Sequence, residues 1–191
     1  MAREGRLTYA LGISDPLRPD ALRTLTELKS MARRSQLILL SGDRQENVEA
    51  TAAGLPIDQM KGGFLPQDKD DFIQDLQRRG HRVAFVGDGI NDSPALTRAD
   101  VGIAIGSGTQ VAIEVSDIVL VKSRFSQLVS TLFYARKTMA NMRENIAIAV
   151  LTVVLLLVGL FAGYIHMASG MLIHEISILA VILNALRLIR A

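Results

Sequence analysis

The stretch that decides the fold is RVAFVGDGINDSPAL, residues 82–96. After Arg82, the residues VAFV are apolar and β-rich, which predicts a strand over residues 82–86, and a glycine-rich turn follows directly. Gly87 and Gly89 suit a tight turn and close approach of the backbone to a ligand. Asp88 and Asp92 offer hard oxygen donors of the kind that hold Mg²⁺ together with a substrate phosphate. The structural alternative is that these residues only form the turn and cap the following helix.

Residues 1–122 alternate short apolar runs with helical patterns, which predicts an α/β layer with a mostly parallel sheet. Ligand sites in such sheets lie at the carboxyl ends of the strands. Two polar turns fall there, SGD at residues 41–43 and GDGIND at residues 87–92. Strands are predicted over residues 7–13, 36–40 and 82–86, helices over residues 18–34, 45–54 and 67–80, and the alternation continues to residue 121.

Residues 146–165 read IAIAVLTVVLLLVGLFAGYI, twenty residues without a charge. A helix that rises about 1.5 Å per residue spans the roughly 30 Å hydrocarbon core with this length, whereas buried core helices are usually shorter. A second apolar stretch at residues 171–189 follows a link that contains His166 and Gly170. The sequence therefore predicts a transmembrane helical hairpin at residues 146–190, reached through an amphipathic connecting helix at residues 123–145.

The charges around the two spans predict their orientation and their lipid environment. Lys and Arg precede the first span and end the second, and the link between the spans has neither. Cytoplasmic loops carry the excess of Lys and Arg, so we expect the soluble part and both ends in the cytoplasm and membrane lipid around the hairpin of a plasma or inner membrane. The basic residues concerned are Arg136, Lys137, Arg143, Arg187 and Arg190.

The overall composition excludes several classes of function. A net charge of +2, from 21 basic and 19 acidic residues, gives no bulk electrostatic reason to bind nucleic acid. The chain has no cysteine, which excludes disulfides, zinc–thiolate sites and a thiol nucleophile.

Two further pieces suit phosphate chemistry. The LLSGD segment offers the Ser41 hydroxyl with backbone amides nearby, and PQDK offers Lys69 at a helix start. A positioned cation neutralises charge that develops on a transferring phosphoryl group. Lys69 taken alone has the alternative interpretation of a solvated surface lysine; together with Ser41 and the two aspartates, in this order, it favours the phosphate site.

These segments, with SDPLRPDA and the 39-residue run from Val83 to Val121, resemble the C-terminal third of a P-type ATPase. The resemblance covers almost the whole chain and implies a haloacid-dehalogenase-like phosphorylation domain. It implies that Asp88 coordinates Mg²⁺ with support from Asp92, and that Ser41 and Lys69 contact the phosphoryl group. The remaining residues implied for phosphate or nucleotide are Gly42, Asp43, Gly87, Gly89 and Asn91, with Asp15 and Arg18 at the hinge toward a nucleotide-binding domain.

Only two spans follow the phosphorylation domain, and the ending NALRLIR is similar to the heavy-metal-transporting branch. The family's nucleophilic aspartate in a DKTGT motif, its TGE motif and its nucleotide-binding domain do not occur in these 191 residues. We therefore expect the C-terminal portion of a heavy-metal pump that cannot complete a phosphorylation cycle alone, with ATP bound through the missing nucleotide-binding domain and the remaining parts of the pump as possible partners. The alternatives are a membrane-tethered phosphatase of the same superfamily and a non-catalytic membrane regulatory protein.

The candidate ligands for a transported ion are His174, Glu175 and Ser177. Ionisable side chains inside a span are costly and point to function. Imidazole and carboxylate suit Co²⁺, Zn²⁺, Ni²⁺, Mn²⁺ or Cd²⁺ better than Cu⁺, which prefers sulfur. The HEISI segment resembles the HEG-S/T signature of the cobalt- and zinc-related subgroup, with Ile176 in place of the glycine. The alternative is that His174 and Glu175 lie near the membrane face, within reach of water.

Overall fold

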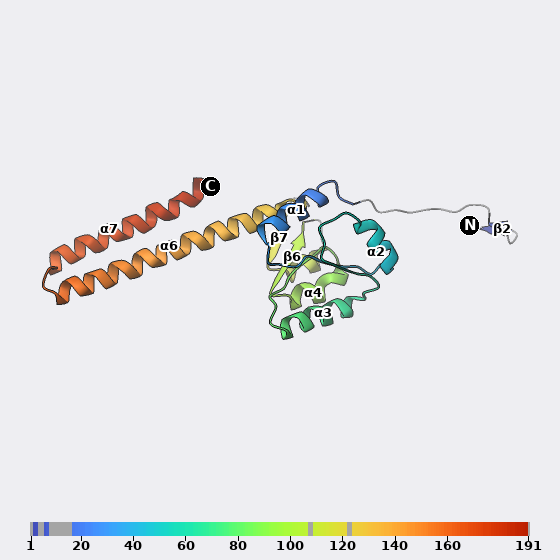
Figure 1. Cartoon of the computed structure of the whole chain (residues 1–191), viewed down its shortest axis with the longest axis horizontal. Coiled ribbons are helices and arrows are strands. Elements are labelled where there is room, and N and C mark those ends of the chain that lie inside the picture. The colour runs from blue at the N-terminus through green and yellow to red at the C-terminus, as the bar shows by residue number, and fades with distance from the viewer. Residues whose placement is uncertain (1, 4–5, 8–16, 107–108, 122–123, 191) are drawn as a thin grey trace. The chain divides into compact units, whose positions relative to one another are not determined.

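The computed structural model describes residues 2–3, 6–7, 17–106, 109–121 and 124–190 (Figure 1). The chain forms two compact units, Met1–Val129 and Ser130–Ala191, which are described separately. Near the N-terminus, β1 (Ala2–Arg3) pairs antiparallel with β2 (Arg6–Leu7). Most of the strand expected over residues 7–13 and the hinge residue Asp15 lie outside the described residues.

The first unit contains two separate parallel sheets. The larger has the order β5–β6–β7, with Val86 opposite Ile103 and Ile103 opposite Ile118. The smaller pairs β3 with β4. The α/β class and the parallel direction are confirmed, but the described parallel strands form two sheets where one was expected. The strands are β3 (Ile38–Leu40), β4 (Gln59–Lys61), β5 (Ala84–Gly87), β6 (Val101–Ile105) and β7 (Ile118–Leu120).

The helices of the first unit begin and end close to their predicted limits. The N-cap of α1 is Asp20, so this helix starts three residues after the predicted position. Beyond α2, Gly54 has φ +83°, a conformation that glycine adopts without strain. The carboxylate of Asp68 accepts a hydrogen bond from the N–H of Leu65 and holds the start of α3. The helices are α1 (Ala21–Met31), α2 (Gln45–Ala52), α3 (Pro66–Arg78), the 3₁₀ turn η1 (Ile90–Asp92), α4 (Ser93–Arg98) and α5 (Gln110–Glu114).

Apolar packing holds the larger sheet in place. Ile103, Ile105 and Leu120 form a buried cluster on β6 and β7. On the helices, Ile73 of α3 and Leu96 of α4 are fully buried, and α3 and α4 lie side by side next to β5 and β6 (Figure 1). This packing fixes both helices near the carboxyl end of β5, where the GDGIND turn begins.

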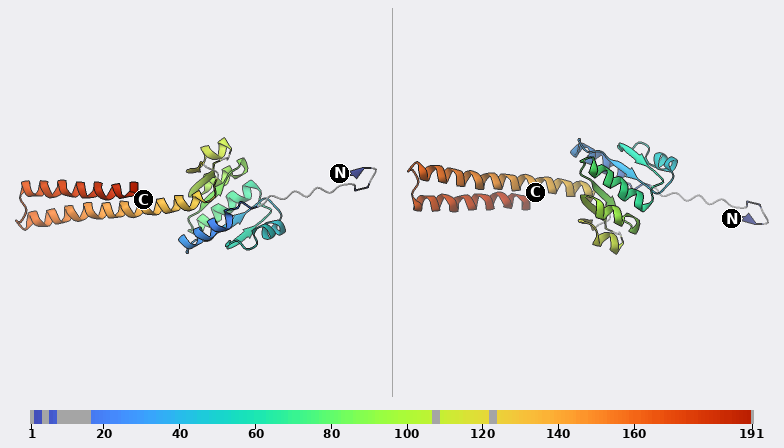
Figure 2. Two further views of the ribbon diagram at one scale, coloured as in Figure 1. Left: turned by 90° about the horizontal axis from the view of Figure 1, so that it is seen from above. Right: turned by 90° about the horizontal axis from the view of Figure 1, so that it is seen from below.

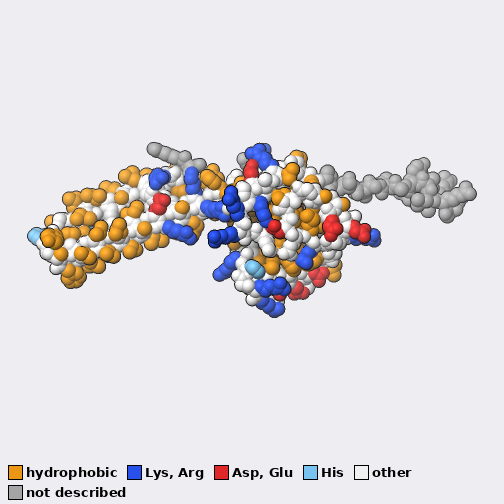
Figure 3. Space-filling view, viewed as in Figure 1, with side chains coloured by type: hydrophobic (Ala, Val, Ile, Leu, Met, Phe, Trp, Pro, Cys, Tyr) orange, Lys and Arg blue, Asp and Glu red, His pale blue; other side chains and the backbone are white. Residues whose placement is uncertain are grey.

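The second unit is a hairpin of two long helices, α6 (Gln127–Phe161) and α7 (Met167–Leu186), followed by the 3₁₀ turn η2 (Arg187–Arg190). The two helices run side by side in both views of Figure 2. Both are long and apolar enough to cross a membrane, and hydrophobic side chains cover the visible face of the hairpin (Figure 3). The fold is therefore an α/β unit with parallel strands and a C-terminal hairpin of the transmembrane type.

The helix limits differ from the prediction in two places. The expected connecting helix and first span are one continuous helix, which ends at Phe161 where the prediction placed the end at residue 165. The cause is Gly163, whose φ of +77° belongs to a turn. Gly170 was assigned to the link but lies inside α7, which begins at Met167.

Candidate functional site

The GDGIND turn begins where β5 ends and is shaped by a close backbone approach. A Cβ atom at Gly87 would lie 2.8 Å from the Cβ of Asp92 and 2.9 Å from its Oδ2. Gly89 is extended, with φ −113° and ψ 166°, and neither glycine has a positive φ. Gly87 is therefore required because Asp92 packs against it, and neither glycine adopts the left-handed conformation that favours this residue.

Lys69 and Asp92 form the central ion pair of the site. The Lys69 Nζ lies 2.7 Å from Oδ1 of Asp92, and the two side chains are only 13% and 16% exposed. Lys69 comes from the first turn of α3, whose position is fixed by packing against α4. Hydrogen bonds between charged partners are roughly twice as strong as neutral ones. The structure thus holds a cation directly beside the turn that carries the two aspartates.

Asp88 is the open carboxylate of the turn. Its side chain is 59% exposed, and Arg18 Nη2 lies 4.0 Å from its Oδ2. The backbone carbonyl of Asp88 accepts a hydrogen bond from the N–H of Thr109, which fixes its main chain. Asn91 is also exposed. Of the predicted hinge pair, the structure places Arg18 next to the site, whereas Asp15 lies outside the described residues.

The SGD turn follows β3 in the smaller sheet. Oγ of Ser41 accepts a hydrogen bond from the N–H of Asp43 at 3.2 Å. A Cβ at Gly42 would lie 3.4 Å from the carbonyl oxygen of Phe64, so the main chain is closely packed there. Among the hydrogen bonds and ion pairs of the described residues, none joins this turn to the GDGIND turn. Ion pairs therefore join Lys69 and Arg18 to the GDGIND turn, whereas Ser41, Gly42 and Asp43 make no such contact with it among the described residues.

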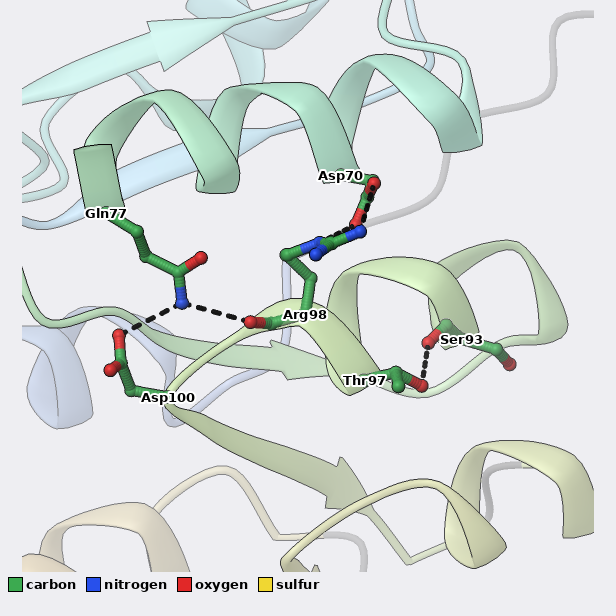
Figure 4. Close-up of polar contacts among 6 residues, drawn as sticks. All are labelled: Asp70, Gln77, Ser93, Thr97, Arg98 and Asp100. Carbon is green, nitrogen blue, oxygen red and sulfur yellow. Dashed lines mark hydrogen bonds and ion pairs between the residues drawn. The ribbon is translucent and has the colours of Figure 1, made fainter.

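A second ion pair lies beside Lys69 and was missed in the sequence (Figure 4). Asp70 is 8% exposed, and Arg98 of α4 donates to it from Nε at 2.8 Å and from Nη2 at 3.4 Å. The hydrogen bond that Arg98 donates to Asp70, followed by the charge of the same carboxylate, raises the pKa of the Arg98 guanidinium. The available signal was an acidic residue next to Lys69, but its partner is 28 residues away. Two adjacent residues of α3 thus form ion pairs with the η1–α4 segment: Lys69 with Asp92 and Asp70 with Arg98.

Asp100 joins the C-terminal ends of α3 and α4. It accepts hydrogen bonds from the N–H of Val83, from Arg82 at 2.7 Å and from Gln77 at 3.2 Å. The backbone bond from Val83, followed by the bonds from Arg82 and Gln77, lowers the pKa of Asp100 to about 2. Gln77 also donates to the carbonyl of Arg98, as Figure 4 shows. These contacts hold the segment that enters β5 and the segment that leaves α4, and they have no direct part in ligand binding.

The candidate transported-ion residues lie on α7. His174 and Glu175 are exposed in the hairpin, and Ser177 is half-buried. The Ser177 hydroxyl donates to the carbonyl of His174 at 2.7 Å, a contact within one helix turn. Among the described residues, no three His, Cys, Asp or Glu side chains gather as a metal site. Within the described residues, His174 and Glu175 therefore belong to no complete three-ligand site.

Known proteins resemble this chain in both sequence and structure. The family model described as haloacid dehalogenase-like hydrolase matches residues 2–100. The chain belongs to the haloacid dehalogenase-like hydrolase family. It is 37% identical over its full length to a copper-exporting P-type ATPase of Staphylococcus haemolyticus, and 38% identical over 98% of its length to a silver-exporting P-type ATPase of Salmonella typhimurium. A manganese-exporting P-type ATPase of Mycobacterium leprae is 35% identical over 99% of the chain.

Solved structures agree with these relatives. A zinc-transporting PIB-type ATPase in its E2.Pi state matches 91% of the chain with a TM-score of 0.84 and 37% identity, and the match covers 28% of that protein. The resemblance to the C-terminal part of heavy-metal P-type ATPases, with its haloacid-dehalogenase-like fold and apolar hairpin, is confirmed. The chain spans about a quarter of the length of the curated relatives, 24% of the copper-exporting ATPase and 23% of the silver-exporting ATPase.

Proposed function

We propose that this chain is the C-terminal part of an ATP-driven pump for a heavy-metal cation. Residues 1–122 form part of its phosphorylation domain, residues 123–145 connect to the membrane, and residues 146–190 form two spans, with both ends in the cytoplasm. The observation that carries the proposal is the 2.7 Å ion pair between Lys69 and Asp92 at the carboxyl end of β5. A positioned cation and carboxylates at such a strand end suit phosphoryl transfer, which depends on charge neutralisation.

The two aspartates fit Mg²⁺ in complementary ways. Mg²⁺ is usually held by one or two carboxylates, with substrate phosphate and water completing its shell. Asp88 offers an exposed carboxylate, and Asp92 is oriented by Lys69. The ion would neutralise charge on the phosphoryl oxygens. In this scheme Lys69 also faces the phosphate, Arg18 lies beside Asp88, and Gly87 and Asn91 shape the turn.

The split between the two sheets supports a nucleophile supplied from elsewhere in the pump. Among the described residues, β3 and β5 each have one paired neighbour, and both carry a phosphate-type turn at their carboxyl end. One further parallel strand between them would join the sheets and place its own carboxyl end between Ser41 and Asp88. The 191 residues contain no DKTGT motif for that position. The nucleotide-binding domain that brings ATP is likewise supplied by another part.

The proposed cargo is a divalent transition metal of the Co²⁺, Zn²⁺, Ni²⁺, Mn²⁺ or Cd²⁺ class. His174, Glu175 and Ser177 supply its ligands from α7, because imidazole and carboxylate favour borderline ions. The names of the relatives span copper, silver, manganese and zinc transport, which supports a transition metal without selecting one. Since His174 and Glu175 project in different directions, other spans of the pump complete the site.

The test is phosphorylation from ATP labelled on its γ-phosphate. The chain alone is expected to give no acid-stable, hydroxylamine-sensitive phosphoenzyme. A second polypeptide that carries the DKTGT motif and a nucleotide-binding domain should become labelled in membranes only when this chain is present, and Asp88→Asn should abolish the labelling. Labelling of the chain alone, or turnover of a generic phosphate ester by the chain alone, would contradict the proposal and favour a tethered phosphatase.

A further inference from the structure

The two helices of the hairpin meet along a line of shielded side chains. On α6 and on α7, half-buried residues recur at intervals of three and four, the spacing of one helix packed against another. Asn141 is only 6% exposed and is the one buried residue among the described residues of the second unit. The shielded residues are Asn141, Asn145, Ile148, Thr152, Leu156 and Gly159 on α6 and Ser177, Val181, Asn184 and Leu188 beyond the loop.

Three asparagines on this line form a network across the two helices. Asn141 Nδ2 donates to the backbone carbonyl of Asn184 at 2.8 Å. In return, Asn184 Nδ2 donates to Oδ1 of Asn145 at 2.9 Å and to Oε2 of Glu144 at 3.1 Å. Asn145 Nδ2 reaches Oδ1 of Asn141, and Arg187 donates to Oδ1 of Asn184. Each of the three amide side chains therefore both donates and accepts in this amide network.

The network also caps the end of α7. The helix ends at Leu186, and the N–H of Arg187 bonds to the carbonyls of Ala185 and Asn184 in place of a regular α-helical bond. The last carbonyls of an α-helix lack the regular intrahelical partner and take others. Asn141 supplies a second partner for the carbonyl of Asn184 from α6. A side chain of one helix thus holds the last turn of the other.

Asparagine side chains between two apolar helices are energetically unfavourable unless they are hydrogen-bonded. Asn184 lies in the second proposed span, where leucine would insert into a membrane more favourably and a polar side chain is tolerated when it pairs across helices. Asn141 and Asn145 lie at the end of the connecting segment that precedes the first span. In coiled coils a buried asparagine lowers stability while it fixes register. The same physics here fixes the rotation of α7 about its axis. Ser177 is seven residues before Asn184, so it faces α6 with Asn184, whereas Glu175 projects away from that face.

We propose that the amide network locks α7 to α6, so that the two helices move as one body. The consequence rests on the proposed function: α7 carries the ion-path residues, and α6 begins at Gln127, in the unit of the phosphorylation site. A locked pair would make the ion-path residues follow any movement of α6. The role of Asn141, Asn145 and Asn184 is positioning, since none of them lies at the phosphate site or in the ion-ligand set.

The test measures the distance between the helices in the full chain, reconstituted in phospholipid nanodiscs. The sequence has no cysteine, so two introduced cysteines carry the only spin labels. Labels at Ile146 and Leu183, which are 59% and 66% exposed, report on the end of the hairpin that contains the network. Labels at Val158 and Leu172, which are 61% and 63% exposed, report on the loop end. Pulsed electron–electron double resonance spectroscopy measures the distribution of spin–spin distances for each pair.

The wild-type chain should give one narrow distribution for each pair. Asn184→Leu removes two hydrogen bonds across the helices, which at about threefold per bond shifts the population ratio roughly tenfold toward separated or rotated helices. A second, broader component should then appear for the Ile146–Leu183 pair and not for the Val158–Leu172 pair. Thr152→Val is the matched control, because Thr152 lies on the same face but donates to Ile148 of its own helix at 2.8 Å.

If Asn184→Leu fails to insert into the membrane, Asn141→Leu and Asn145→Leu decide the question, since each removes one bond across the helices. A distribution unchanged from wild type in these variants would overturn the lock, as would equal broadening in Thr152→Val. The measurement needs no ATPase activity. A failed phosphorylation experiment therefore leaves it intact, and a failed lock leaves the phosphorylation proposal intact.

Discussion

Replacing Gly87 by alanine tests whether close packing of Asp92 shapes the candidate site. The added Cβ would lie 2.8 Å from the Cβ of Asp92 and 2.9 Å from its Oδ2, so Asp92 must move. Overpacking of this kind costs about 1–3 kcal/mol. Displacing Asp92 also strains its 2.7 Å bond to Lys69, and hydrogen bonds to charged groups contribute about 1.5–3 kcal/mol. Because part of that bond survives a small shift, we expect a total loss of about 2–4 kcal/mol of unfolding free energy.

Hydrogen–deuterium exchange of the β6 amides measures this loss directly. At a tenfold change for each 1.4 kcal/mol, exchange through unfolding of the unit should be roughly 30- to 700-fold faster in Gly87→Ala. Gly89→Ala is the matched control in the same motif. Its Cβ would meet nothing closer than the N of Asn91 at 3.9 Å, and its φ of −113° suits any residue. Exchange rates of the two variants within about threefold of each other would refute the packing argument.

Three other predictions test the surrounding groups. A double-mutant cycle of Lys69→Met and Asp92→Asn should give a coupling free energy of about 1.5–3 kcal/mol by amide exchange, and coupling below about 0.5 kcal/mol would contradict the ion pair. The lowered pKa of Asp100 means that its stabilisation is complete above its ordinary pKa of 3.8 and is lost as the pH falls toward about 2. The wild-type chain should therefore lose more stability than Asp100→Asn between pH 5 and pH 2.5 in parallel unfolding experiments, and equal losses would count against the assignment. In an assembled pump, His174→Ala with Glu175→Ala should abolish metal-stimulated ATPase activity, and unchanged stimulation would exclude these residues as the ion site.

The parts of the site that could be predicted from the sequence are those that depend on short stretches of chain. The GDGIND turn follows an apolar strand in the sequence, and it follows β5 in the structure. The apolar hairpin could likewise be predicted, because a run of twenty uncharged, mostly apolar residues is typical of a transmembrane helix. In contrast, β4 has no apolar pattern, since QMK forms a strand only through its backbone pairing with β3. Local patterns carry no information about such a partner.

The contacts that were missed join residues far apart in the chain. Asp70 and Arg98 are 28 residues apart, and Asn141 and Asn184 are 43 apart. Each residue alone reads as an ordinary polar residue of a helix, and its partner is determined by how the helices pack. Gly87 shows the same limit in another form. Its presence was evident, but the reason for it depends on where Asp92 lies in three dimensions.

The two carboxylates of the GDGIND turn are not equivalent, and their surroundings assign them different tasks. Asp92 is held on two sides, by the Lys69 ammonium and by the main chain at Gly87, and its side chain is 16% exposed. Asp88 is 59% exposed, with only the Arg18 guanidinium at 4.0 Å. A metal ion that binds one carboxylate must displace water at Asp88, which costs less than displacing the partly buried Lys69 ammonium at Asp92. Asp88 is therefore the carboxylate that the structure leaves open for the proposed Mg²⁺, and Asp92 keeps Lys69 beside it.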